Sequence, residues 1–279
     1  MNIINKYTCN SNNLEHFVLK LKAKRTPPII DYIREYYHPN NSEEIKKQIR
    51  LFPKNHFAIK LSSLGIRQNE DLCYMHVDSI IRCALENNCK ILIDAEQHEI
   101  QENIDVISSE FMKKYNCLNV NVYKTYQMYK KNALDKLMFD LKNKRDYKIG
   151  VKLVRGAYLL EDKNKNVLCN NEIETHKQYN DAIKLFIDNN NLNDILLCAT
   201  HNIKSIHLAR YYMNEKNINN VEFSQLLGMS DTMTTYLQKS GYKVYKYLPY
   251  GSFHESISYL LRRLYENKNM IKYLLYELK

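Results

Sequence analysis

Short runs of strand-forming residues alternate with helix-like segments along nearly the whole chain. The strand-like runs are rich in β-branched and aromatic residues and span 56–64, 89–96, 119–127, 147–158, 194–202, 220–229 and 242–251. The helix-like segments between them span 71–88, 99–115, 130–144, 172–190, 203–216, 230–240 and 252–267. Strict alternation of this kind is typical of parallel strands joined by crossover helices.

An eighth strand-like run, HFVLKLKAK at 16–24, precedes the others. Eight strand–helix units in a chain of 279 residues fit an α/β fold of the (β/α)8 TIM-barrel type. The rival is a doubly wound open sheet, whose dinucleotide-binding form needs the pattern G-x-G-x-x-G after a strand. The chain has six glycines, and their spacing does not form that pattern. We therefore predict a single barrel domain over residues 1–279.

Polar residues follow the apolar part of seven of these runs. They are Lys60, Asp94, Glu96, Gln127, Arg155, Thr200, His201, Asn202, Gln225 and Tyr247. In a parallel barrel the carboxyl ends of all strands open onto the same face, which is where barrel enzymes place their chemistry. One polar residue after a strand is ordinary turn chemistry, but a series of seven predicts an active site at this face.

The run VKLVRGAY places two cations and a glycine at the end of a strand. Lys152 and Arg155 suit a phosphate or a carboxylate, and Gly156 would let a ligand approach the backbone. The alternative is an ordinary strand end with a glycine turn, and this motif alone does not decide between the two.

The run ATHN places a hydroxyl, an imidazole and an amide directly after another strand. Asn202 also fits the N-cap of the following helix. No second histidine or carboxylate has metal-ligand spacing with His201, so we interpret His201 as a hydrogen-bonding group and predict no metal site. A G-x-S-x-G nucleophile elbow is missing from the sequence, which argues against a serine hydrolase.

The last helix-like segment carries two stripes. Its polar stripe consists of Tyr259, Arg262, Arg263 and Glu266, at spacings that share one helical face. Its apolar stripe, expected to face the core, consists of Ile257, Leu260, Leu261 and Leu264. Ser252 and Glu255 fit a capping box that starts the helix just after the preceding strand. The polar stripe is either a solvated face with an ion pair or one wall of a site at the barrel mouth.

The formal net charge of +10 favours anionic partners, but the basic residues are spread along the chain. Dedicated nucleic-acid binding is therefore kept only as a minor alternative. The seven cysteines are scattered and form no C-x-x-C motif, which indicates reduced thiols in a reducing, intracellular compartment. No apolar run reaches the roughly 18 residues that a membrane span needs, and no secretory signal is evident.

Eight stretches, in order along residues 57–267, resemble those of the proline dehydrogenase family of flavoenzymes. They are IKLSSLG, LIDAEQ, TYQMY, VKLVRGAYL, ATHN, QLLGM, YKYLPYG and YLLRRLYEN. The resemblance implies a distorted (β/α)8 barrel whose last helix lies over the barrel mouth. It also implies oxidation of L-proline to Δ1-pyrroline-5-carboxylate by hydride transfer to flavin N5 of FAD, the first step of proline catabolism to glutamate.

The resemblance also implies roles for individual residues. The groups expected to hold proline are Lys60, Arg262 and Arg263 at its carboxylate, Asp94 behind them, and Tyr158, Leu227, Tyr247 and Tyr259 around its ring. The groups expected to contact FAD are Gln127, Lys152, Val154, Arg155, Gly156, Ala157, Thr200, His201, Asn202, Gln225 and Glu266.

The resemblance leaves several alternatives. A small residue tends to replace Tyr247 in the related hydroxyproline dehydrogenases, so the bulky ring predicts a preference for proline over hydroxyproline. A non-catalytic barrel that binds proline or FAD is the other reading. The family's first strand usually carries acidic residues, whereas the run at 16–24 is basic.

Electrons are expected to pass to a quinone or another acceptor, with peripheral contact to an anionic membrane. The expected location is the matrix side of the mitochondrial inner membrane in a eukaryote, and otherwise the cytoplasm or the membrane surface. The sequence shows neither an aldehyde-dehydrogenase region nor room for a DNA-binding module, so we expect a monofunctional enzyme.

Overall fold

The computed structural model describes the backbone of residues 4–266 and the side chains of residues 6–261. Within this range, parallel strands close into a barrel. They are β2 (Pro28–Tyr32), β3 (His56–Ile59), β4 (Lys90–Ile93), β5 (Val122–Gln127), β6 (Gly150–Val154), β7 (Ile195–Ala199), β8 (Val221–Leu226) and β9 (Val244–Gly251). Each strand pairs with the next, and β9 pairs with β2 as well as β8, with Ile29 opposite Tyr247. The fold is therefore the expected (β/α)8 TIM-type barrel.

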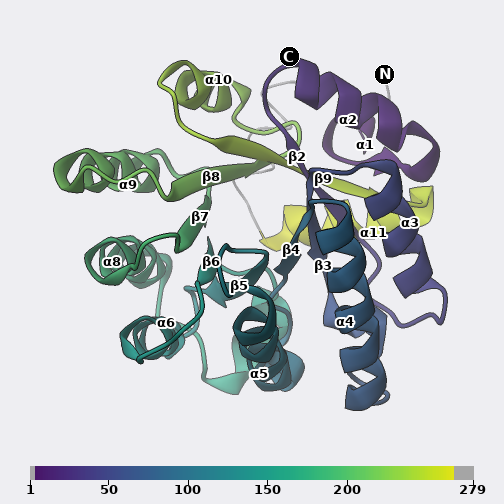
Figure 1. The fold of residues 1–279 in the computed structure, drawn as a ribbon, viewed down its shortest axis with the longest axis horizontal. Helices are drawn as coiled ribbons and strands as arrows, with labels where there is room; N and C mark the ends of the chain where they lie inside the picture. The colour runs from purple at the N-terminus through teal and green to yellow at the C-terminus, as the bar shows by residue number, and fades with distance from the viewer. Residues whose placement is uncertain (1–3, 267–279) are drawn as a thin grey trace.

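Helices surround the strands (Figure 1). The main ones are α2 (Leu14–Ala23), α3 (Asn41–Leu51), α4 (Glu70–Glu86), α5 (His98–Tyr115), α6 (Ala133–Lys142), α8 (Glu172–Asn189), α9 (Ile203–Lys216), α10 (Asp231–Lys239) and α11 (Phe253–Glu266). Shorter elements are α1 (Ile4–Tyr7), β1 (Cys9–Asn10), α7 (Leu159–Asp162) and 3-10 turns at Ser11–Asn13, Leu61–Leu64 and Lys163–Lys165. The seven helix-like segments of the sequence correspond to α4, α5, α6, α8, α9, α10 and α11, whereas α3 was not predicted.

The core has two layers. One set of strand side chains packs outward against the helices, for example Phe57, Ile91 and Phe223, all buried. A second set fills the barrel interior and includes Ile29, Ala58, Leu92, Val120, Tyr123, Leu197, Tyr245 and Tyr247. This alternation follows from the two-residue period of a strand. The interior is a packed core, and the strands present their functional groups at one open end.

The expected strand at 16–24 is wrong, because residues 16–23 lie in helix α2 and Lys24 is the C-cap of that helix. Leu14, Val18 and Leu21 are its buried residues, at spacings of four and three that suit a helix. The first barrel strand is β2, which begins immediately after Pro27 and is buried at every position. It carries Asp31, so the first strand is acidic at its carboxyl end.

Helix α11 begins as the sequence predicted. The Ser252 N–H donates to Glu255 Oε2 (2.8 Å) and the Glu255 N–H donates to Ser252 Oγ (3.3 Å), which confirms the capping box. Tyr259 and Leu260 are both buried and pack with Tyr7, from the N-terminal segment. Since α11 also contacts β1 and β9, it lies beside the end of the barrel's last strand.

One part of the apolar stripe is wrong: Leu261 is 60% exposed, so it does not face the core. The buried side of α11 instead includes Tyr259, from the polar stripe, together with Leu260. The remaining stripe residues lie within α11 or at its end, but their side chains are outside the described part of the structure. They are Arg262, Arg263, Leu264 and Glu266.

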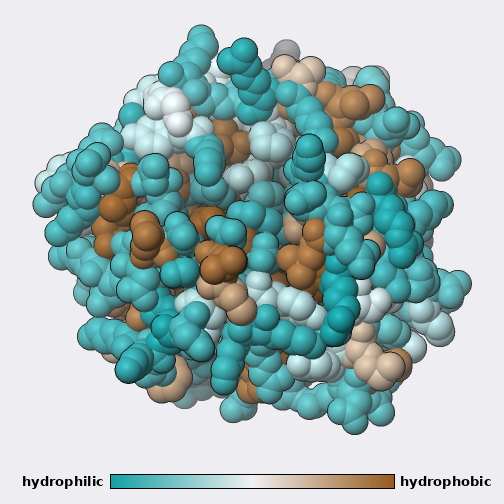
Figure 2. Space-filling view, in the orientation of Figure 1, coloured by the Kyte–Doolittle hydropathy of each residue, from teal (hydrophilic) through white to brown (hydrophobic). Residues whose placement is uncertain are grey.

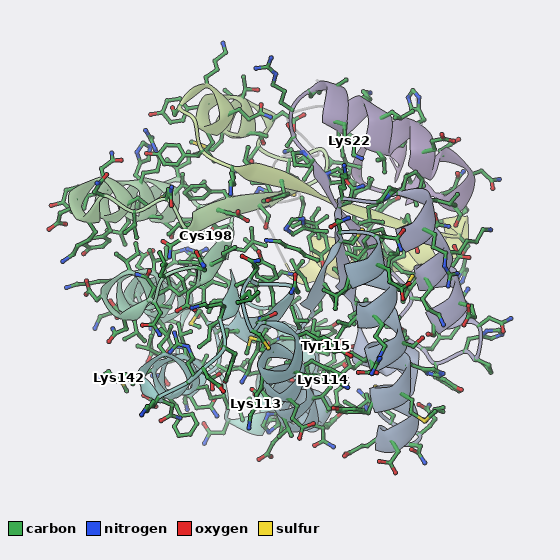
Figure 3. The ribbon with its side chains drawn as sticks, viewed as in Figure 1. Lys22, Lys113, Lys114, Tyr115, Lys142 and Cys198 are labelled. Atoms are coloured by element: carbon green, nitrogen blue, oxygen red, sulfur yellow. The ribbon has the colours of Figure 1, made fainter. Side chains whose placement is uncertain are left out.

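The molecular face shown in Figure 2 is largely hydrophilic, with separate small apolar patches. Figure 3 labels Lys22, Lys113 and Lys142, which project from three different helices. Positive charge is thus spread over the surface, as the sequence indicated. Among the described residues, no helix is both long enough and apolar enough to cross a bilayer.

Candidate functional site at the carboxyl ends of the strands

A buried ionic cluster lies at the carboxyl ends of the strands. Lys152 Nζ lies 2.6 Å from Asp94 Oδ1, and the Tyr247 hydroxyl donates to Asp94 Oδ2 over 2.7 Å. Lys60 Nζ lies 3.4 Å from the same Asp94 oxygen and also forms an ion pair with Asp31. Four of these residues were expected at a site, and the fold brings them together from β3, β4, β6 and β9 and the segments directly after them.

Asp31 is the member that sequence analysis missed, because β2 was placed in the wrong segment. It is 1% exposed and is the direct partner of Lys60. An aspartate in an apolar run that starts after two prolines was the signal that could have revealed it. With Asp31 included, the cluster holds two carboxylates and two ammonium groups, so the buried charges compensate each other.

The charged groups in this cluster shift each other's pKa values. Burial alone would raise the pKa of Asp94, but the ammonium groups of Lys152 and Lys60 outweigh it and lower that pKa to about 2. Burial opposes the charge of Lys60, yet Asp31 and Asp94 raise its pKa above the ordinary lysine value. Burial, followed by the charges of Asp31 and Asp94, raises the pKa of Tyr247 well above its usual range. Tyr247 therefore stays a neutral donor.

At the ends of two strands, a buried amide side chain has one atom with no hydrogen-bond partner in the described part of the structure. Gln127 Nε2 donates to the Glu96 carbonyl (3.2 Å), but Gln127 Oε1 has no hydrogen-bond partner among the described residues. Gln225 Oε1 accepts from Thr234 (2.5 Å), while Gln225 Nε2 is similarly unpaired within residues 6–261. Buried polar atoms are normally satisfied, so two such atoms at the mouth fit hydrogen bonding to a bound ligand.

Arg155 is held by protein groups. Its Nε donates to His176 Nδ1 (2.9 Å), Nη1 to Thr200 Oγ1 (2.7 Å) and Nη2 to Ser205 Oγ (2.9 Å). Its guanidinium also lies over the Tyr179 ring. These contacts tie the end of β6 to α8 and α9, a role that the sequence did not reveal.

The run ATHN has a local structural role. Asn202 accepts from the Ser205 N–H (3.1 Å) and is the N-cap of α9, as predicted. His201 Nε2 accepts from the Leu226 N–H (3.2 Å), and Nδ1 lies 3.1 Å from Ser230 Oγ. Burial, with the charges of Lys246 and Arg155, lowers the pKa of His201 to about 4. A neutral His201 therefore fastens the loop after β8 to the end of β7.

The loop after β6 is shaped by groups that sequence analysis missed. Gly156 has φ +147°, and a Cβ there would lie 2.5 Å from the ring of Tyr129. The Tyr129 hydroxyl donates to Asp162 Oδ2 (2.7 Å), and the His98 N–H donates to Asp162 Oδ1 (3.0 Å). Gly156 is thus required by a protein ring rather than only by the approach of a ligand.

The other expected residues also lie at this end of the barrel. Tyr158 and Leu227 are buried, and the Tyr158 hydroxyl lies 3.4 Å from Glu35 Oε1. Val154, the last residue of β6, and Ala157, in the loop after it, are partly exposed. Arg262, Arg263 and Glu266 lie in α11, but the positions of their side chains are outside the described residues.

Glu96 does not join the cations, although the sequence made it a candidate partner. Its carboxylate accepts from the backbone N–H of Ser62 (3.0 Å) and from the Ser62 hydroxyl. Burial raises the pKa of Glu96 to about 7, against these hydrogen bonds. Glu96 therefore supports the 3-10 turn that follows Lys60. Within the described side chains, no group of three or more His, Cys, Asp or Glu could hold a metal ion.

The fold and this cluster define a (β/α)8 barrel with a charged, hydrogen-bonding site at the carboxyl ends of its strands. The model of the proline dehydrogenase family matches residues 14–274. The chain therefore belongs to the proline dehydrogenase family, whose members are flavoenzymes.

Curated relatives are about 30% identical to this chain over the residues that align. Proline dehydrogenase 1, mitochondrial, of Dictyostelium discoideum is 32% identical over 229 residues, which is 76% of this chain and 40% of the relative. Proline dehydrogenase 2, mitochondrial, of Arabidopsis thaliana is 33% identical over 297 aligned residues, covering 95% of this chain and 62% of the relative. The Hydroxyproline dehydrogenase of Xenopus laevis is 29% identical and covers 84% and 54%. The chain thus spans less than two thirds of the length of each.

Solved structures share the fold at lower identity. Proline utilization A from Bdellovibrio bacteriovorus, inactivated by N-propargylglycine, superposes with a TM-score of 0.83 at 17% identity. The match covers 95% of this chain and 32% of that protein. At this level of identity the likeness supports the barrel fold.

Proposed function

We propose that this chain is an FAD-dependent proline dehydrogenase that oxidises L-proline to Δ1-pyrroline-5-carboxylate, the first step of proline catabolism to glutamate. The observation that carries the proposal is the buried Lys60–Asp94–Lys152–Tyr247 cluster at the strand ends of a family member. Family membership alone would also fit a barrel that only binds ligands, whereas this cluster offers groups that orient a small zwitterion.

Lys60 is the group that we assign to the proline carboxylate, together with Arg262 and Arg263 of α11. A guanidinium pair binds a carboxylate in a fixed fork geometry, and the ammonium group adds charge without directional constraint. The buried rings of Tyr247 and Tyr259 would pack against the pyrrolidine ring, together with Tyr158 and Leu227. Asp94 would keep Lys60, Lys152 and Tyr247 in place, because it contacts all three.

The residues at the mouth fit FAD. Two buried atoms that are unpaired within the described residues would bond to the cofactor: Gln127 Oε1 would accept a hydrogen bond from it, and Gln225 Nε2 would donate one to it. FAD, when bound, would supply the acceptor for the hydride that leaves proline. The remaining groups assigned to the FAD site are Lys152, Val154, Arg155, Gly156, Ala157, Thr200, His201, Asn202 and Glu266. Arg155 and Asn202 already bind protein groups, so their side chains would act on FAD by fixing the loops around it.

We also propose an electron acceptor, a cellular location and a domain organisation for this chain. Electrons would pass to a quinone or another acceptor, and the positive surface would favour contact with an anionic membrane. Several curated relatives are named as mitochondrial. For this chain we propose the matrix side of the inner membrane in a eukaryote, and otherwise the cytoplasm or the membrane surface. Residues 1–279 are proposed to form one domain, with no nucleic-acid partner.

The test is an absorbance spectrum of the purified protein, followed by anaerobic addition of L-proline. A flavin band near roughly 450 nm that bleaches with proline is the expected result, since the hydride reduces the flavin. A bound flavin that proline leaves oxidised would favour the non-catalytic barrel. Bleaching by trans-4-hydroxy-L-proline but not by proline would favour the hydroxyproline dehydrogenase alternative. Failure to bind added FAD would refute the cofactor assignment.

A further inference from the structure

Arg34, in the segment after β2, lies between the last helix and the turn that follows Lys60. Its Nε lies 2.6 Å from Glu255 Oε1, in the first turn of α11. Its Nη1 donates to Asn41 Oδ1 over 3.1 Å. The guanidinium carbon lies over the rings of Tyr32 and Tyr36, at 5.3 and 5.0 Å from their centroids. Arg34 is therefore fixed on three sides.

Asn41 continues this network toward Lys60. Asn41 Nδ2 donates to the Ser63 carbonyl over 2.9 Å. The Ser63 hydroxyl in turn donates to the Lys60 carbonyl over 2.7 Å. Asn41 is 1% exposed and Ser63 is equally buried, so these hydrogen bonds are shielded from water. A continuous chain of polar contacts thus runs from α11 to the backbone of Lys60.

Glu255 has two separable roles at the other end of the network. Its Oε2 accepts from the Ser252 N–H and completes the capping box, while its Oε1 contacts Arg34. The Tyr36 hydroxyl donates to the same Oε1 over 3.1 Å. Glu255 is mostly buried and Arg34 is partly exposed, so the ion pair is stronger than one on an open surface. The first turn of α11 is therefore attached to the β2–α3 segment.

We propose that Arg34 is a positioning residue that fixes α11 relative to Lys60 through Glu255 and Asn41. This inference rests on the proposed function, in which Lys60, after β3, and the arginines of α11 bind the same substrate carboxylate. Misplacement of reacting or binding groups by about 1 Å lowers rates by up to roughly 100-fold. A link through Arg34 would hold the distance between Lys60 and α11 without touching the substrate.

The test compares Arg34→Met, Arg34→Lys, Glu255→Gln and the Arg34→Met/Glu255→Gln double variant. Methionine keeps apolar packing on Tyr32 and Tyr36, and glutamine keeps an oxygen for the Ser252 N–H. Amide hydrogen exchange of α11 is expected to be faster in Arg34→Met and to be partly restored in Arg34→Lys. The KM for L-proline should rise roughly 10- to 100-fold in Arg34→Met, with a much smaller change in kcat.

In the double variant, the exchange rate of α11 and the KM are expected to rise no further than in Arg34→Met, because both substitutions remove the same Arg34–Glu255 interaction. Lys47→Met is the matched control. Lys47 is an exposed cation on α3 that lines the same open cavity of about 620 Å³ as Arg34 and Glu255. Its removal should leave exchange in α11 and the KM unchanged.

Unchanged exchange in α11, or faster exchange with an unchanged KM, would overturn the inference. If Arg34→Met does not fold, Glu255→Gln carries the same test, since it removes the charge of the other partner. The exchange measurement also separates the two proposals. If the wild-type protein binds flavin but does not react with proline, the proposed proline oxidation is refuted. Loss of protection from exchange in α11 of Arg34→Met would still show that Arg34 attaches α11 to the β2–α3 segment.

Discussion

Asp94 is the residue on which the charged cluster depends, because Lys60, Lys152 and Tyr247 all contact its carboxylate. Its replacement by asparagine would leave the two ammonium groups with Asp31 as their remaining carboxylate in the cluster. We expect Asp94→Asn to lower the free energy of unfolding at neutral pH by about 3 kcal/mol, the typical effect of breaking a buried ion pair.

The effect of Asp94→Asn should depend on pH. The pKa of Asp94 in the folded protein is about 2, below the ordinary aspartate value of about 3.9. A lowered pKa contributes stability that is present above the unfolded pKa and is lost as pH falls through the folded one. Urea unfolding of both proteins between pH 6 and pH 2 measures this. A stability difference that does not narrow below about pH 4 would contradict the assignment of an ionised Asp94.

Glu96 gives the opposite pH dependence. Its pKa is raised to about 7 by burial, so its protonated form stabilises the fold below the unfolded pKa and that contribution is lost as pH rises through 7. We expect Glu96→Gln to unfold with a free energy that changes less between pH 4 and pH 8 than that of the wild type. The difference should be on the order of 3 kcal/mol, from the size of the pKa shift. Parallel curves for the two proteins would mean that folding does not raise the pKa of Glu96.

Tyr247 is the residue at which we expect specificity to be set. Its ring is buried at the site, and its hydroxyl contacts Asp94 and Lys152. Under the proposed function, Tyr247→Ser would open space beside the substrate ring and raise the ratio of kcat/KM for 4-hydroxyproline to that for proline by roughly 10-fold or more. Steady-state kinetics with both substrates measures the ratio. Tyr247→Phe, which keeps the ring, is the control and should keep the preference for proline.

At the scale of elements, the strand–helix alternation was enough to predict seven of the barrel strands and the helices between them. It failed at 16–24, because the apolar spacing of that run fits a helix as well as a strand. Leu14 lies just before it and adds the position that makes the helical stripe continuous with Val18 and Leu21. The true first strand has five residues and itself begins with a proline, Pro28, so it gives a weak signal on its own.

The residues of the candidate site could likewise be predicted from the sequence only in part. Asp94, which follows β4, and Tyr247, which lies within β9, could be placed at the barrel mouth from the sequence. Asp31 could not, since its strand was assigned elsewhere. The contacts of Arg34 and Asp162 join segments far apart along the chain, and no local pattern encodes such long-range pairs. Sequence patterns thus predicted the ends of strands better than the contacts between loops.

The loop after β6 gives a prediction at this scale. Gly156→Ala should lower the free energy of unfolding by roughly 2–5 kcal/mol, because a Cβ would both overlap the Tyr129 ring and strain a left-handed backbone. Thermal unfolding and flavin content are the measurements. Gly241→Ala is a matched control: Gly241 also has a positive φ, but its Cβ would meet nothing within 4 Å among the described residues. An equal loss in both variants would argue against the Tyr129 contact.

At the scale of the whole molecule, we expect the proposed single domain to unfold in one transition. The outward-facing core is one connected cluster that includes residues from Cys9 to Tyr250. A continuous core of this kind is the mark of one domain. Far-UV circular dichroism and the near-UV signal of the 23 tyrosines, in a chain without tryptophan, should follow the same urea curve. Two separated transitions would instead divide the chain into independent units.

The closing pair of the barrel has a consequence for synthesis on the ribosome. Strand β2 is among the first strands to be made, yet one of its edges pairs with β9, near the other end of the chain. Until β9 leaves the exit tunnel, the nascent sheet has two open edges, and such edges readily pair with other chains. Chaperones that bind exposed strands would be needed most during this interval. The same step brings Tyr247 to Asp94, so the candidate site is completed only after β9 has been made.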